Sequence, residues 1–253
     1  MTRVRGANGP KGPTVDVVMT ESTVTVVDRA GKRRVLSLEQ ATTLCVEDLL
    51  PVRLPKTYRK ARHATGRYVF SRTGEIVVYE SWLEYVNIVL LDFSGEYLWL
   101  LGQPVLLTID GSAHYPDLLA RSADGSLKLF DVKPAEEAVR EPHLGTFRAR
   151  AAACMQLGWA FDVLSEPPNE ILLENVLYLA GFRFQSALPE GLVDQVVGAC
   201  TTPCEIGALD VLGLRALVRP AVLHLLWTKQ LTANLAEARL DRGTIVVAAG
   251  QTS

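Results

Sequence analysis

The alternation of apolar and polar residues predicts a β-hairpin near the start of the chain. Between Thr14 and Leu36, β-branched and polar residues alternate on both sides of an Ala-Gly-Lys turn, which is typical of paired strands. A short helix is expected over residues 37–45, because Ser37 suits the N-cap and Gln40 follows three residues later. Residues 1–52 are therefore expected to form an N-terminal tail and a β-hairpin extension.

Strand and helix patterns alternate through the middle of the chain. The order of strand, helix, strand, hairpin, helix, strand and helix predicts an α/β core with a mixed sheet flanked by helices. Helices are expected over residues 80–91, over residues 134–157 with Gly158 as the end, and in a segment reaching Ala180. Residues 98–110 are expected to form one or two strands, interrupted at Gly102 and Pro104. The expected core positions of the second helix are Phe147, Ala151, Cys154 and Met155.

The pattern changes after Arg183. Three short helices are expected, followed by a β-hairpin with Asp241-Arg242-Gly243 at its tip. Three helices and a terminal β-hairpin are typical of a winged-helix module. A boundary near residues 185–190 then separates a domain over 53–184 from a C-terminal domain over 185–253.

Composition and charge narrow the class of protein. The chain has 253 residues, 48% hydrophobic residues, 21% charged residues and a net charge of −2, which is typical of a soluble globular protein. No apolar run reaches the roughly 18–20 residues of a membrane helix. The basic N-terminus lacks the apolar core of a signal peptide and is expected to be a disordered tail. We therefore expect a cytoplasmic protein that makes no contact with a membrane.

A local basic segment departs from the neutral overall balance. Residues 53–72 contain seven Lys and Arg residues and no acidic residue. The segment is either a solvated surface or an arm that contacts phosphates, with Tyr58 and Tyr68 available for stacking on bases. The candidate DNA-binding residues are Arg59, Lys60, Arg62 and Arg67.

Charged residues stand where a second hairpin should bury apolar ones. If residues 123–125 form a three-residue loop with Gly125 at positive φ, Ser122 pairs with Ser126. That register places Asp117 opposite Asp131, with Lys133 two residues further on the same face. Facing carboxylates destabilise a strand pair by at least a few tenths of a kcal/mol. A divalent cation such as Mg²⁺ would compensate, because it prefers carboxylate and water oxygens.

Two interpretations are open for the remaining polar residues near this hairpin. Glu80, Glu84 and Asn87 fall on one stripe of an apolar helix, which either faces solvent or brings Glu84 to the two aspartates. Lys133 either forms a surface pair with Asp131 or stabilises the charge of a phosphodiester under attack by a metal-bound water. His114 is either a base or a simple polar contact.

The order of these residues is similar to a known signature. Pro116-Asp117 followed by Asp131-Val132-Lys133 resembles the PD-(D/E)xK nuclease motif. The longer run resembles the TnsA-like endonuclease subunits of heteromeric transposases, over roughly residues 58–184. One departure is that Tyr115 directly precedes Pro116, without the residue that separates them in that family. The matching segments are 81–84, 103–104, 115–117 and 131–134.

This resemblance implies a restriction-endonuclease-like fold and a metal-dependent DNA endonuclease that nicks the 5′ ends of a transposon. Glu84, Asp117 and Asp131 would be metal ligands for Mg²⁺, with Mn²⁺ as a substitute, and Lys133 the catalytic lysine. Glu80 lies one turn before Glu84 and is an alternative to it. A DDE-type transposase subunit would process the 3′ ends, and an AAA+ ATPase would be the regulator.

Two other functions remain open. The same fold is used by stand-alone restriction or repair nucleases, and a DNA-binding scaffold without enzymatic activity would also suit a basic arm. In the C-terminal module the candidate recognition helix has only Arg219, His224 and Lys229 as basic residues. We therefore expect this module to contact a partner protein, while Arg239 and Arg242 allow DNA contact. Pro220 is expected in the first turn of that helix.

Overall fold

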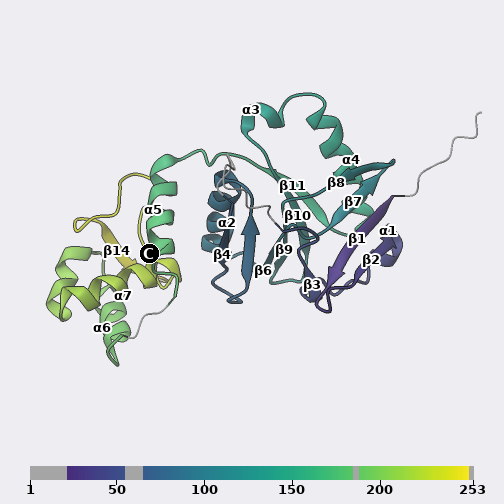
Figure 1. Ribbon diagram of the computed structural model, residues 1–253. Helices are drawn as coiled ribbons and strands as arrows, with labels where there is room; N and C mark the ends of the chain where they lie inside the picture. Colours follow the sequence, from purple (N-terminus) through teal and green to yellow (C-terminus); the bar gives the residue numbers. More distant parts are fainter. Residues whose placement is uncertain (1–21, 55–64, 185–187, 251–253) are drawn as a thin grey trace, which may run out of the picture.

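The computed structural model describes residues 22–54, 65–184 and 188–250 (Figure 1). The predictions for the N-terminal tail, for the start of the first hairpin, and for Arg59, Lys60 and Arg62 lie outside these residues. The fold is mixed α/β, as predicted, with strands and helices interspersed along the chain. Within the described ranges, no helix combines the length and the apolar character needed to cross a membrane.

A four-stranded mixed sheet lies at the centre of the molecule. Its strand order is β11-β10-β9-β6, with β10 and β11 parallel and the other neighbours antiparallel. A two-stranded antiparallel ribbon, β4 and β5, precedes it in the chain. The bounds are β4 Gly66–Val69, β5 Ile76–Tyr79, β6 Tyr97–Gly102, β9 Leu118–Ser122, β10 Leu127–Val132 and β11 Ala160–Leu164.

Successive residues of the central strands are buried on opposite faces of the sheet. Leu118 and Phe130 belong to a core shared with α2 (Trp82–Ser94) and α5 (Glu170–Ala180). Leu119 and Leu129 belong to a second core shared with α4 (His143–Leu157). Figure 1 shows the sheet between α2 and α4. Because both faces are covered, these strands read as continuous apolar runs.

The N-terminal hairpin is confirmed for its described residues. β1 (Thr23–Asp28) pairs with β2 (Arg33–Ser37), and β1 also pairs with β7 (Leu106–Ile109), which continues to β8 (Ser112–His114). The predicted capping box of Ser37 and Gln40 is present, but α1 ends at Ala41 and is shorter than expected. The smaller elements that follow are η1 Val46–Asp48 and β3 Leu49–Leu50.

The helix after β10 divides into α3 (Ala135–Ala138) and α4. Gly158 ends α4 in the left-handed conformation, with φ 72°, as predicted. Phe147 and Cys154 are buried, whereas Met155 is 80% exposed and its predicted core position is wrong. A helix turns about 100° per residue, so the position next to Cys154 leaves the buried stripe.

The C-terminal module contains the three predicted helical segments and a three-stranded sheet of order β12-β14-β13. The predicted terminal hairpin is wrong, because β14 pairs with β12 and β13 and not with residues 238–240. The prediction that Pro220 lies in the first turn is wrong, because α7 begins at Arg215 and Pro220 is inside the helix. The bounds are α6 Leu192–Ala199, β12 Cys204–Glu205, η2 Ile206–Leu212, α7 Arg215–Trp227, β13 Leu231–Thr232 and β14 Ile245–Ala248.

One apolar core runs from the central sheet into the C-terminal module. Val176 and Leu179 of α5 lie in the same cluster as Val222 and Leu226 of α7. The boundary predicted at residues 185–190 falls between these two helices, and residues 185–187 of it lie outside the described ranges. The division of the chain into three domains stays a prediction.

Candidate functional site

A cavity of about 490 Å³ lies where β9 begins and β10 ends. All four residues that the sequence singled out for catalysis line it, although they come from the segment before β9, from β10, from α2 and from the segment after β10. The charged lining residues are Arg53, Glu80, Glu84, Asp117, Asp131, Lys133, Glu137 and Arg150. We call this space the strand-end cavity.

The register of the second hairpin brings the two aspartates together. Gly125 has a φ of 86°, and the Ser122 N–H donates to the Ser126 carbonyl at 2.9 Å. The pairing continues to Leu118 opposite Phe130, and the Asp117 N–H donates to the Phe130 carbonyl at 3.0 Å. The predicted register is therefore confirmed as far as Leu118 opposite Phe130, and beyond this pair Asp117 and Asp131 both line the strand-end cavity.

Asp117 is held by its neighbours in the sheet. Its Oδ2 atom accepts a hydrogen bond from the Val132 N–H at 2.7 Å. Burial raises the pKa of Asp117, while this hydrogen bond and the charges of Lys133 and Arg150 act in the opposite direction. A cation near Asp117 would therefore favour its ionised form.

Asp131 is the most deeply buried charge of the cavity. Its side chain is 1% exposed and forms an ion pair with Arg150 of α4, whose side chain is 12% exposed. The other carboxylate oxygen, Oδ1, has no hydrogen-bond partner among the described residues. The alternative of a surface pair between Lys133 and Asp131 is wrong, because Arg150 takes the place of Lys133.

Glu84 reaches the cavity from the first turn of α2. Its carboxylate accepts hydrogen bonds from the Glu80 N–H at 2.8 Å and the Ser81 hydroxyl at 3.0 Å, while the Ser81 oxygen caps the helix. Glu84 is only 7% exposed, so the alternative of a solvent-facing stripe is wrong. Burial, followed by the negative charge of Asp117, raises the pKa of Glu84 to about 7.

Glu80 is not part of the helical stripe, because α2 begins only at Trp82. The Glu80 carboxylate pairs with Arg53 Nη2 at 2.5 Å. The Arg53 Nε–H also donates to Gln103 Oε1 at 2.8 Å. Glu80 therefore already has a cationic partner, whereas Glu84 has the negative charge of Asp117 beside it.

The Gln-Pro pair after β6 positions Asp117 through the backbone. The Gln103 N–H donates to the Asp117 carbonyl at 2.8 Å, and Gln103 is fully buried with a φ of 52°. Gly102 precedes it, where an added Cβ would lie 2.2 Å from the Val78 carbonyl oxygen. This close approach of β6 to β5 explains why a glycine stands before Gln103.

The remaining predicted residues lie as follows. Lys133 is half-buried and lines the cavity, and its N–H donates to the Leu164 carbonyl at 2.9 Å. His114 Nδ1 lies 3.1 Å from Arg150 Nη2, which fits a polar contact, and burial together with Arg150 lowers the pKa of His114. Arg67 is exposed on β4 and does not line the cavity.

Sequence reasoning missed Arg150. The signal was available, because Arg150 lies three residues after Phe147 and four before Cys154, on the face of α4 expected to be buried. An arginine on the buried face of a helix needs a partner, because an unpaired charge is costly to bury. Asp131 is that partner.

The carboxylates of the cavity suit a hard divalent cation in chemistry but are not arranged as a finished site. Three carboxylates from separate elements, one with an unpartnered buried oxygen, are ligands that Mg²⁺ accepts. In the described ranges, however, no three His, Cys, Asp or Glu side chains are gathered closely enough to hold a metal ion. Glu84 is turned toward its helix cap, and Asp131 toward Arg150.

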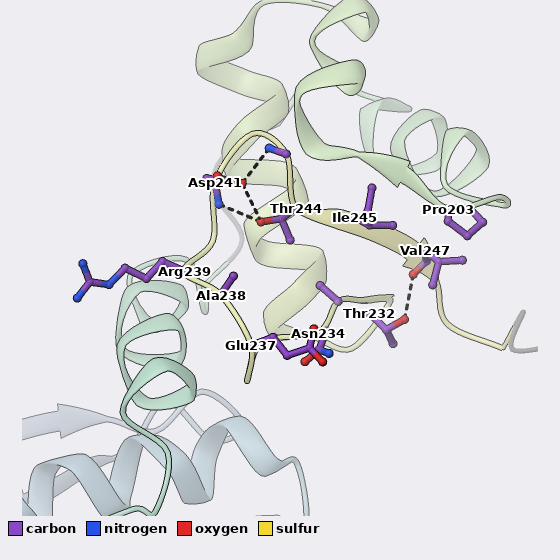
Figure 2. A pocket seen from close by; sticks show the side chains of 12 residues that line it. Pro203, Thr232, Asn234, Glu237, Ala238, Arg239, Asp241, Thr244, Ile245 and Val247 are labelled. Carbon is purple, nitrogen blue, oxygen red and sulfur yellow. Dashed lines mark hydrogen bonds between the residues drawn. The ribbon is translucent and has the colours of Figure 1, made fainter.

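A second cavity of about 770 Å³ lies beside the loop between β13 and β14 (Figure 2). Asp241 accepts hydrogen bonds there from the Gly243 N–H at 2.8 Å and the Thr244 hydroxyl at 3.2 Å. Arg239 pairs with Glu174 at 2.5 Å. Asp241 therefore stabilises the turn of the loop, and Arg239 attaches the loop to α5. Because these charges have structural roles, the strand-end cavity is the better candidate for chemistry.

Comparison with known proteins adds no assignment. No protein-family model matches the chain, and no curated protein matches its sequence significantly. The roles of the cavity residues therefore depend on the geometry and on the order of the motif.

Proposed function

We propose that this protein is a metal-dependent DNA endonuclease of the PD-(D/E)xK type. The single observation behind this proposal is that the hairpin brings Asp117 and Asp131 to one cavity, which Lys133 and Glu84 also line. Two carboxylates at the ends of adjacent strands, a third from a helix and an amine beside them are groups that suit phosphodiester hydrolysis with Mg²⁺.

The residues of the cavity have separate roles in this proposal. Glu84, Asp117 and Asp131 would hold Mg²⁺ or Mn²⁺, which when bound supplies an activated water and neutralises phosphate charge. We favour Glu84 over Glu80 because Glu80 is already paired with Arg53. Lys133 would stabilise the negative charge that develops on the phosphate. The Val132 N–H holds the Asp117 carboxylate in place.

We propose further that the enzyme is the TnsA-like subunit of a heteromeric transposase and nicks the 5′ ends of the element. The motif run supports this, since Ser81 caps α2 and binds Glu84, and Gln103 holds Asp117. The central sheet with helices on both faces is compatible with a restriction-endonuclease-like fold. A DDE-type transposase subunit and an AAA+ ATPase would then be its partners, and Arg59, Lys60, Arg62 and Arg67 would contact the DNA.

For the C-terminal module we propose a winged-helix arrangement that binds a partner protein. Its order of α6, β12, η2, α7, β13 and β14, with β14 central in the sheet, supports this arrangement. The candidate recognition helix α7 is largely buried and packs against α5 and α6. His224 is also engaged, with Nδ1 2.9 Å from the Phe182 carbonyl oxygen. Little of α7 is left to enter a DNA groove.

The decisive test is a nicking assay on duplex DNA with the element ends, with Mg²⁺ or Mn²⁺ and with the partner subunits present. Lys133→Ala should lower the rate by at least about 100-fold, as for loss of a charge-stabilising donor. Lys128→Ala is the matched control, because Lys128 lies on β10, the strand that leads to Lys133, and does not line the cavity. Equal cutting by wild type and Lys133→Ala would show that the proposal is wrong. Cutting without partners would favour a stand-alone nuclease.

One observation favours a second candidate, a DNA-binding scaffold without enzymatic activity. Arg150 already neutralises Asp131, as expected if the charges of the cavity serve only to stabilise the fold. This candidate predicts that the protein binds duplex DNA but gives no heat on titration with Mn²⁺. Measurable Mn²⁺ binding that Asp117→Asn removes would exclude it.

A further inference from the structure

Arg150 is a permanent charge in the lining of the strand-end cavity. Its guanidinium pairs with Asp131 Oδ2 and lies 3.1 Å from His114 Nδ1 through Nη2. One polar atom on each side stays without a partner among the described residues, Nε of Arg150 and Oδ1 of Asp131. A pair built only for stability would be expected to satisfy these buried atoms.

The position of Arg150 is set by α4 and not by a flexible loop. Cys154 and Leu157 anchor the same face of this helix in the core between α4 and the sheet, and Phe147 is buried against Phe161 of β11. Arg148, two residues earlier, points instead to solvent, with a side chain that is 77% exposed and 3.9 Å from Glu141. Any withdrawal of Arg150 from Asp131 is therefore a side-chain rotation.

Arg150 supplies the compensation that two facing carboxylates need. Its charge acts on Asp117 as well as on its direct partner Asp131. Lys133 also acts on Asp117, but Asp131 is paired with Arg150, and Arg53 is paired with Glu80. A divalent cation at the same carboxylates would repel a guanidinium at contact distance. An arginine side chain cannot relieve this repulsion by losing a proton.

We infer that Arg150 is an internal counter-cation of the Asp117–Asp131 pair, which must release Asp131 before a divalent metal binds there and so lowers the metal affinity of the site. This inference rests on the proposed function, because it takes the two aspartates to be metal ligands. Arg150 is then a positioning residue that decides whether Asp131 is available as a ligand.

The test is calorimetric titration of Mn²⁺ into the full-length chain as wild type, Arg150→Gln and Arg148→Gln. Arg150→Gln removes the competing charge and should bind Mn²⁺ at least about tenfold more tightly than wild type. Arg148→Gln, from the exposed face of the same helix, should bind as wild type does. Thermal unfolding gives a second readout, since Mn²⁺ should raise the midpoint of Arg150→Gln more than that of wild type.

The outcomes separate this inference from the proposed function. Equal or weaker Mn²⁺ affinity in Arg150→Gln, with binding that Asp117→Asn abolishes, overturns the role of Arg150 and leaves the metal site in place. No Mn²⁺ binding by any variant overturns both. If Arg150→Gln does not fold without metal, the inference requires Mn²⁺ to restore the folded state by circular dichroism. Failure to fold in saturating Mn²⁺ overturns it.

Discussion

The strand-end cavity and the second cavity, beside the loop between β13 and β14, are both lined by charged residues but differ in how far these charges are buried. We call the second one the C-terminal cavity. In the strand-end cavity Asp131 is 1% exposed and keeps one oxygen without a partner among the described residues. In the C-terminal cavity Arg239 is 77% exposed and pairs with Glu174 through two hydrogen bonds. The first cavity holds charge at a high cost in desolvation, and the second holds it at almost none.

This difference indicates where chemistry is possible. A buried carboxylate oxygen without a hydrogen-bond partner can be stabilised by a ligand. An exposed ion pair is already hydrated, so a ligand adds little stabilisation there. The size of a cavity does not decide the matter, because the C-terminal cavity is the larger of the two. Four pairs of experiments test the comparison.

The largest expected difference is in nicking activity. Asp117→Asn should lower the nicking rate by at least about 100-fold, because it weakens both the metal site and the charge balance beside Lys133. Asp241→Asn, in the C-terminal cavity, should cut at the wild-type rate, since asparagine also suits that turn. Rates are measured on plasmid carrying the element ends. A comparable loss in Asp241→Asn would remove the functional distinction between the two cavities.

The next difference is in stability without metal. Arg150→Met leaves Asp131 buried and uncompensated, which should lower the free energy of unfolding by about 3–5 kcal/mol. Arg239→Met breaks only an exposed pair and should change it little. Urea denaturation with a chelator present measures both. If the two variants are equally stable, the ion pair at Arg150 is not as well shielded from solvent as its burial indicates.

The third difference is in the sign of the pH dependence. Glu84 has an ordinary pKa of 4.5, which the fold raises to about 7, so between these values the folded state binds the proton more tightly than the unfolded state. The free energy of unfolding should therefore fall by about 3 kcal/mol as the pH rises through this window. Glu84→Gln should remove this slope.

Glu174 provides the opposite case, because its hydrogen bond with Arg239 lowers its pKa. Its contribution to stability is present above its unfolded pKa and is lost as the pH falls through the folded pKa. Urea unfolding from pH 2.5 to 8, with a chelator, follows both residues. A slope that persists unchanged in Glu84→Gln would assign it to another group.

The smallest expected difference lies in two glycines. Gly125→Ala places a side chain at a φ of 86° in the turn that sets the register of Asp117 and Asp131, which should cost about 1–2 kcal/mol. Gly243→Ala in the C-terminal loop should change stability by less than about 0.5 kcal/mol, because its added Cβ would meet only Asp241 Oδ1, at 3.5 Å. Thermal unfolding compares them. A larger loss in Gly243→Ala would contradict this account of the two turns.

Local rules predicted much of the fold. The Ser37 and Gln40 capping box, the end of α4 at Gly158 and the register around Gly125 all depend on residues within a few positions of one another. The terminal hairpin was predicted wrongly because Leu231 and Thr232, not the residues just before Asp241, supply the partner strand. Such a pairing across a long loop has no local signal.

The same local rules predicted part of the candidate site. The meeting of Asp117 and Asp131 at one end of the hairpin follows from the turn between them, since that turn sets the register. The roles of Glu80 and Glu84 could not be separated in the sequence, because the start of α2 and the position of Arg53 decide them. The pairing of Arg150 with Asp131 was missed because Arg150 lies on α4 and Asp131 on β10. Only the packing of this helix on the sheet brings the two side chains together.

By itself, the sequence determined the mixed α/β class, the hairpin register and the order of the motif, because each of these follows from neighbouring residues and their backbone preferences. Only the tertiary structure decided that Glu84 is buried beside Asp117, that Glu80 is paired with Arg53 and that Arg150 neutralises Asp131. The physical reason is that charge interactions depend on distance and burial. Both are set when helices from distant parts of the chain pack on the sheet.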